Sequence, residues 1–415
     1  MSEILEQIKE ASGFDINDVL SEVLASIPDE DTFDQIVIEL GKKCLADSSF
    51  RQDLGDFGGL EVLLQSISKD DERSSRFQTL LKSLKPILHG SKTNKEILRE
   101  CAFLTVVVDR TFNLDGSVNP DCVRFLSTAV SSCDENRKVV GTPLTIAALI
   151  KITAAAPATS ETFVVCTELI VKLCTQDDTN KASPVGVWCR DQIAEEYLDD
   201  LFACLNAAKQ ILPKNQKTFL SLCCCFSSKA EIVTRLVDEL KLLEIIKAVV
   251  TEAREAGAAS DPKMVMQAFK LIRNLAFTDT LKSPLYDIIS AHVLAKIEVF
   301  LSAPYDRVVM TEMLFGILAV VTLHSKDISG DIWQIPGFPE FLRVHMLKLS
   351  GKALLQCLQL VRNSARHGVS VCDAVIAVIR DGELATKEDC SRTQTLVGEI
   401  VRIDDRKKAE EAELI

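Results

Sequence analysis

Histidine is the side chain best suited to transfer protons or bind metals near neutral pH. This chain of 415 residues has only five histidines, at positions 89, 292, 324, 345 and 367. None belongs to an H-E-x-x-H motif or to a local cluster with cysteine, so the sequence predicts no metal site. His89 and His367 fall where long helices should end, and a charged imidazole there interacts favourably with the helix dipole. We therefore interpret the histidines as structural.

Paired carboxylates are the next candidates for chemistry, and they occur at Glu195-Glu196 and Asp199-Asp200. A general acid–base dyad needs two convergent carboxyl groups in different environments. These pairs fit better the solvated face of an amphipathic helix. The sequence also contains no phosphate-binding loop, no dinucleotide-binding glycine motif and no nucleophile elbow. We expect a protein that is not an enzyme and that uses no cofactor.

Fourteen cysteines are present, but no two of them form a C-x-x-C pair. Cys223, Cys224 and Cys225 are consecutive. Consecutive residues of a helix point in different directions, so these three cannot form one metal cage. Free cysteine commonly behaves as a small buried apolar residue. We expect reduced, structural thiols in a cytoplasmic or nuclear protein.

Two segments combine an apolar helical stripe with a final Arg-Asn pair: residues 266–276 and residues 355–365. An asparagine amide can bond the backbone of an extended partner, and arginine can hold acidic groups through two parallel hydrogen bonds. The same asparagines could instead bond a neighbouring carbonyl within the protein, and the arginines could simply be solvated. The candidate groove residues are Arg273, Asn274, Arg362 and Asn363.

Trp333 lies in an apolar segment, Gly330 to Pro339, that is rich in proline and glycine. Tryptophan is over-represented at the energetic centres of interfaces, so Trp333 is a possible interface anchor. The alternative is that it packs against the adjacent part of its own chain.

Long helices that recur along the chain should position these candidate residues. The predicted helices begin at intervals of roughly 40 to 47 residues, which is typical of armadillo and HEAT arrays. One wider interval follows Thr159, and the polar stretch near 176–185 explains it as an inserted loop. The predicted starts are Phe33, Ser74, Asn119, Thr159, Lys214, Pro262, Asp306, Ser350 and Lys387.

The ending Leu-Ile-Arg-Asn-Leu-Ala at residues 271–276 resembles the third helix of the armadillo repeat. The ending at residues 360–365 is similar, with Ser364 where leucine is usual. The last 150 residues are most similar to armadillo repeat-containing proteins of the number-six type. The resemblance implies an all-α fold, a right-handed superhelical α-solenoid that binds other proteins on a concave face lined by third helices.

The repeat also predicts how the chain is organised. Stacked repeats bury a continuous core, and atypical units must shield its two ends. We expect an N-terminal helical cap over residues 1–32 and about eight to nine repeats over residues 33–401. The charge-rich residues 402–415 should form a solvated C-terminal tail.

Composition restricts the class of partner. The net charge is −13, so nucleic acid is not expected, and a partner with a basic segment is more natural. Import receptors of this fold place tryptophan four residues before the third-helix asparagine. Here Lys270 and Gln359 occupy those positions, so that role is not expected. No signal peptide and no apolar stretch of about 20 residues is found, so no membrane span is expected.

Two functions therefore stay open. The first is a non-enzymatic scaffold or adaptor that docks extended or helical segments of other proteins. The second is regulation of a small GTPase, in the manner of armadillo-type guanine-nucleotide dissociation stimulators. That role would require binding a switch region or a polybasic lipidated tail, which an acidic groove would suit.

Overall fold

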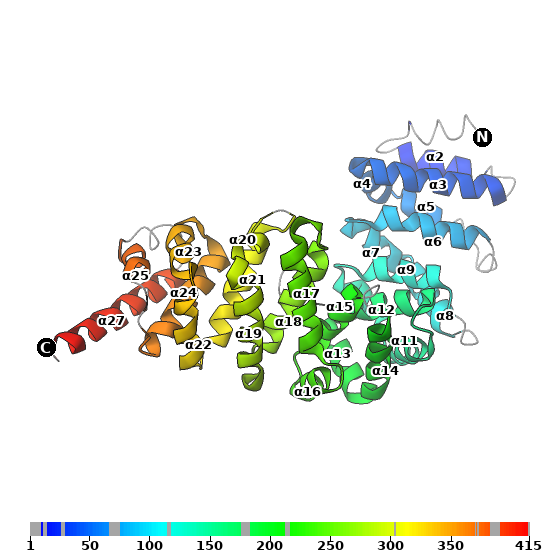
Figure 1. Cartoon of the computed structure of the whole chain (residues 1–415). Helices are drawn as coiled ribbons and strands as arrows, with labels where there is room; N and C mark the ends of the chain where they lie inside the picture. The colour runs from blue at the N-terminus through cyan, green and yellow to red at the C-terminus, as the bar shows by residue number, and fades with distance from the viewer. Residues whose placement is uncertain are drawn as a thin grey trace. The chain divides into compact units, whose positions relative to one another are not determined.

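The computed structural model describes residues 10, 15–25, 30–65, 75–113, 118–175, 183–211, 216–302, 304–369, 371, 373–381 and 391–413. Within these ranges the regular structure is entirely helical (Figure 1), which confirms the predicted all-α class. The chain divides into two compact units, an N-terminal unit, Met1–Cys225, and a C-terminal unit, Phe226–Ile415.

The N-terminal unit contains the described helices α2 to α15. The last residue of α15, Phe226, is the first residue of the C-terminal unit. Its helices are α2 (Asp15–Ala25), α3 (Glu30–Ala46), α4 (Ser48–Asp56), α5 (Gly59–Gln65), α6 (Ser75–Leu88), α7 (Lys92–Glu100), α8 (Phe103–Asn113), α9 (Pro120–Val130), α10 (Asp134–Val140), α11 (Pro143–Ala155), α12 (Glu161–Cys174), α13 (Pro184–Glu196), α14 (Leu198–Gln210) and α15 (Gln216–Phe226).

The C-terminal unit adds short 3-10 helices between its α-helices. Its helices are α16 (Ala230–Asp238), α17 (Leu242–Ala256), η2 (Gly257–Ala259), α18 (Pro262–Leu275), η3 (Asp279–Leu281), α19 (Lys282–His292), η4 (Leu294–Lys296), α20 (Ile297–Phe300), α21 (Arg307–Val321), α22 (Lys326–Asp331), η5 (Ile332–Gln334), α23 (Phe338–His345), η6 (Met346–Lys348), α24 (Gly351–Arg366), α25 (Asp373–Arg380) and α27 (Ser391–Glu413).

The order of helices repeats in groups of three. From α3 to α24, every third α-helix belongs to one recurring class, with two other α-helices between successive members. We call this class the third helices: α3, α6, α9, α12, α15, α18, α21, α24 and α27. Several of them begin where the sequence predicted, because a side chain caps the first turn. Asn119, Asp261 and Asp306 each accept a hydrogen bond from a backbone N–H of the helix that follows.

Third helices pack on one another within each unit. In the N-terminal unit α3 contacts α6, α6 contacts α9, and α9 contacts α12. The contact between α3 and α6 depends on Gly41, since a Cβ added there would lie 3.2 Å from the backbone oxygen of Ser83. Aromatic rings continue the core between repeats, with ring centroids 6.0 Å apart for Phe77 and Phe103 and 5.9 Å apart for Phe103 and Phe125.

The C-terminal unit repeats this packing. Figure 1 shows α18, α21 and α24 in succession, and α18 contacts α21, α21 contacts α24, and α24 contacts α27. Gly316 on α21 permits the close approach of α24, because an added Cβ would lie 3.0 Å from the side-chain nitrogen of Gln356. Each third helix is therefore held by its neighbours along the stack, as in a solenoid.

The described parts of both predicted end segments, residues 1–32 and residues 402–415, are helical. The boundary at residue 32 falls inside α3, with α2 before it. Residues 402–413 continue α27 without a break, and ion pairs join this part to α25. The carboxylate of Asp404 lies 2.7 Å from Arg380 Nη2 and 3.0 Å from Lys408 Nζ. Of the predicted inserted loop, residues 176–182 lie outside the described residues, and α13 begins at Pro184.

The twelve described cysteines are all free, and ten of them are buried. Burial raises the pKa of Cys166 and of Cys204 to about 12, so both thiols stay protonated at neutral pH. Among the described residues, no set of three His, Cys, Asp or Glu side chains is placed to hold a metal ion. No single described helix is long and apolar enough to span a bilayer. The bent pair α10–α11 passes that test by length and composition alone.

Candidate functional site

Asn363 lies at the contact between two third helices. Its side chain is 3% exposed, and its Nδ2 donates to the carbonyl oxygen of Ala319 on α21, 2.8 Å away. Its Oδ1 accepts from Nη2 of Arg362 at 3.3 Å. Both ends of the amide are thus engaged inside the protein. This is the contact that the structural alternative for the asparagine predicts.

Asn274 occupies the corresponding place on α18. It is half-buried, and its Nδ2 donates to Oγ of Ser227 at 3.0 Å. The neighbouring Arg273 is half-buried and has no hydrogen bond or ion pair to another described residue. Of the two predicted residues on this helix, the arginine is therefore the one available to a ligand.

Arg362 belongs to a cluster of charges between α24 and α27. Its Nη1 lies 3.7 Å from Oε2 of Glu399, and Nη2 of Arg366 lies 3.2 Å from the same oxygen. Partial burial and the nearby Arg366 lower the pKa of Arg362, which Glu399 partly offsets. One carboxylate thus serves two guanidinium groups, and the cluster keeps a surplus of positive charge.

Two large apolar side chains are exposed where successive third helices end. Phe277, just past α18, is 68% exposed, and Leu323, just past α21, is 40% exposed. Phe277 follows Arg273 by four residues, in the turn beyond the end of α18. The sequence analysis missed both residues. The available signal was a large apolar residue in a polar turn beyond the last buried position of an amphipathic helix.

The third helices α18, α21 and α24 contact one another in succession, and the turns that follow α21 and α24 are bonded to each other. Nε2 of His367, in the turn after α24, donates to the carbonyl oxygen of Thr322 at 3.2 Å. Arg366 is exposed at the end of α24. The predicted arginines and the exposed apolar side chains therefore share one edge of the C-terminal unit, where third helices end. We call this set the helix-end row: Arg273, Phe277, Leu323, Arg362 and Arg366.

Trp333 lies inside the C-terminal unit. The side chain, in η5, is 7% exposed, and its ring centroid is 6.3 Å from that of Phe338 in an edge-on arrangement. Its indole Nε1 is buried without a hydrogen-bond partner. The tryptophan thus packs on its own chain, as the second sequence interpretation has it, and it is not presented to a partner in this conformation.

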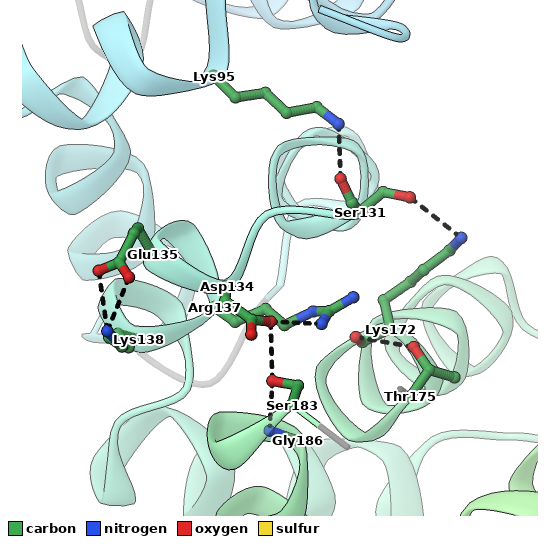
Figure 2. A network of polar contacts seen from close by, with 10 residues as sticks. All are labelled: Lys95, Ser131, Asp134, Glu135, Arg137, Lys138, Lys172, Thr175, Ser183 and Gly186. Atoms are coloured by element: carbon green, nitrogen blue, oxygen red, sulfur yellow. Dashed lines mark hydrogen bonds and ion pairs between the residues drawn. The ribbon is translucent and has the colours of Figure 1, made fainter. Parts of the chain in front are cut away.

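A second concentration of polar groups lies in the N-terminal unit, around the turn between α9 and α10. Figure 2 shows two lysines that reach Ser131 from different helices. Lys95 Nζ donates to the carbonyl oxygen of Ser131 at 2.5 Å, and Lys172 Nζ donates to its Oγ at 3.3 Å. Since Lys95 is on α7 and Lys172 is on α12, these bonds tie successive repeats together.

The same network contains a buried ion pair. Arg137 is 2% exposed, and its Nη1 lies 2.6 Å from Oδ1 of Asp134. The same oxygen accepts from Oγ of Ser183 at 2.7 Å (Figure 2). Ser183 in turn caps α13 by accepting from the backbone N–H of Gly186 at 3.1 Å. All of these groups are engaged with one another, so we assign the network to holding repeats together.

Comparison with known proteins identifies the fold. No protein-family model and no curated protein matches this sequence. An engineered protein solved by the Northeast Structural Genomics Consortium aligns over 94% of this chain and 98% of its own, with 18% identity and a TM-score of 0.54.

A second solved chain comes from work on a conserved phosphorylation switch that controls the interaction between cadherin and beta-catenin. It aligns over 96% of this chain and 75% of its own, with 14% identity and a TM-score of 0.57. Similarity at this level concerns the fold alone. The structural neighbours are armadillo-repeat solenoids, and the predicted fold class is thereby confirmed.

Proposed function

We propose that this chain is a non-enzymatic scaffold or adaptor that docks segments of partner proteins on the helix-end row. The observation that carries the proposal is the pair of exposed apolar side chains, Phe277 and Leu323, which follow the successive third helices α18 and α21, with Arg273 and Arg366 near the ends of α18 and α24. Aromatic side chains and arginine are enriched at interface centres. A solenoid suits this role, because it presents equivalent positions of successive repeats as an extended surface.

The proposal changes which predicted residues should contact a partner. Arg273 and Arg362 keep that role, whereas the contacts of Asn274 and Asn363 favour holding neighbouring helices. The resemblance to armadillo repeat-containing proteins of the number-six type stays a prediction from the sequence.

Site-specific photo-crosslinking tests the row. A photoreactive phenylalanine analogue replaces either Phe277 or Leu323, and the protein is irradiated in extract from its natural source. We expect the same partner polypeptides to be crosslinked from both positions, because one segment should pass over both turns. The crosslinked products are identified by mass spectrometry.

Val308 provides a matched control, because it is 71% exposed at the opposite end of α21 from Leu323. The analogue at this position should give none of the products shared by the two row positions. Equal products from Val308 and Leu323, or no products from the row, would contradict the proposal.

A second candidate function is regulation of a small GTPase through its polybasic tail. A shallow groove of about 690 Å³ along α17 favours it, because three carboxylates and two alanines line it beside Lys247 and Thr251. Basic, lipidated tails combine positive charge with an apolar chain, so such a groove complements both parts. The relevant side chains are Glu244, Ala248, Glu252, Glu255 and Ala256.

Binding of a lysine-rich, prenylated peptide tests this candidate. We expect the Glu244→Lys/Glu252→Lys variant to bind the peptide at least about tenfold more weakly, the change that 1.4 kcal/mol produces. The matched control is Glu195→Lys/Glu196→Lys, a paired charge reversal on α13. Equal loss in the two variants would mean that net charge, and not the α17 groove, controls binding.

A further inference from the structure

A polar cavity lies between the end of α24 and the second half of α27. Its volume is about 760 Å³. Most of the residues that line it are charged, with Ala365 and Ile403 as apolar members. The charged side chains that line it are Arg366, Glu399, Arg402, Arg406, Lys407 and Glu410.

The charges around this cavity do not balance. Four cationic side chains face two carboxylates. Glu399 is already shared by Arg366 and by Arg362 behind it. Among the described residues, Arg402 bonds through its Nε alone, which donates to the carbonyl oxygen of Gly398 at 3.2 Å. Arg406 has no hydrogen bond or ion pair to another described residue. A locally positive cavity thus lies on a chain whose net charge is −13.

From this arrangement we propose that the cavity binds an Asp- and Glu-rich segment of a protein partner, which rests on the scaffold function proposed above. Guanidinium groups hold carboxylates through paired, charge-assisted hydrogen bonds, and Arg402 and Arg406 keep terminal nitrogens for them. The apolar wall formed by Ala365 and Ile403 matches the methylene groups of glutamate side chains. That apolar wall has no counterpart in a chain of phosphates, so a peptide fits better than a polynucleotide.

The cavity also continues the helix-end row. Arg366 belongs to both, and His367 beside it bonds the turn that presents Leu323. A partner segment with apolar side chains over Phe277 and Leu323 would place its adjoining residues at the cavity. We therefore expect the acidic residues to lie beside the apolar residues within one partner segment.

Fluorescence anisotropy with a labelled glutamate-rich peptide tests the cavity on the full chain. We expect Arg402→Glu/Arg406→Glu to weaken binding at least about tenfold, since a single charge-assisted hydrogen bond can account for that factor. Binding should also weaken as salt is raised, because exposed charges are screened. The uncharged variant Arg402→Gln/Arg406→Gln should show a smaller loss in the same direction, and it repeats the test if the reversed charges disturb α27.

Lys263→Glu/Arg307→Glu is the matched control, because both residues are exposed near the N-terminal ends of third helices in the same unit. This variant should bind the peptide within about twofold of the unmodified protein, since only distant charges change. Equal weakening in the two double variants would overturn the proposal. So would a phosphoserine peptide or an oligonucleotide that binds far more tightly than the glutamate-rich peptide. If the peptide fails to bind while Leu323 still crosslinks to partners, the cavity proposal fails and the scaffold function stands.

Discussion

Replacing Asp134 by alanine should destabilise the N-terminal unit by about 3–5 kcal/mol, because it leaves a buried guanidinium without its carboxylate. Arg137 is 2% exposed, and the only ion pair that the described residues give it is the 2.6 Å contact with Asp134. The substitution also removes the acceptor for Ser183 Oγ, which lies 2.7 Å from the same carboxylate oxygen. The measurement is urea unfolding of the full chain, followed by circular dichroism. Hydrogen exchange of α10 assigns the loss to this site.

Two further variants separate the buried charge from the helix that carries it. Asp134→Ala/Arg137→Met should recover most of the lost stability, since an apolar side chain of similar length replaces the unpaired charge. Glu135→Ala should change stability by less than about 1 kcal/mol, because its pair with Lys138 is exposed. A double variant as unstable as Asp134→Ala alone would show that the ion pair is not the cause.

The helical repeat could be predicted because its signals are local. Capping residues such as Asn119 and Asp306 lie directly before the helices that they start, so the chain itself marks those boundaries. Apolar periodicity then gives the buried face of each helix without knowledge of its neighbours. These signals were sufficient for the fold class and for the position of most third helices.

The candidate site was harder to predict, because its residues meet only after the helices stack. Residues 402–413 look like a solvated tail in the sequence, since most of them are charged. Only the packing of α27 on α24 brings Arg402 and Arg406 to the same cavity as Arg366. No pattern within α27 indicates this, because the complementary residues lie on another element.

The roles of the asparagines were also hard to predict from the sequence, because their bonding partners lie on other helices. The Arg-Asn pattern drew attention to Asn363, which donates to a carbonyl oxygen on the preceding third helix. In the N-terminal unit this kind of bond is made by Asn94 and Asn136, which lie on α7 and α10. Nδ2 of Asn94 donates to the carbonyl oxygen of Arg51 at 2.9 Å, and Nδ2 of Asn136 donates to that of Lys95 at 3.0 Å. Their partners lie about one repeat earlier in the chain, so a motif search confined to third helices misses them.

Asn136 should consequently be among the least replaceable polar residues of the N-terminal unit. Its side chain is fully buried, and Nδ2 donates to the carbonyl oxygens of Lys95 and of Ala129, each 3.0 Å away. Asn136→Ala leaves both carbonyls without this donor and should cost about 2–4 kcal/mol of unfolding free energy. Urea unfolding measures the loss.

Asn274→Ala is the matched control for this prediction. Asn274 is half-buried, so water can enter beside alanine at this position and bond Oγ of Ser227, which is itself 3% exposed. Its loss should be about 1 kcal/mol or less. The difference between the two variants follows from the burial of the amide itself: Asn136 is fully buried, whereas the half-buried Asn274 lies within reach of water. Equal losses would mean that the contacts between repeats in the N-terminal unit do not depend on the buried amide.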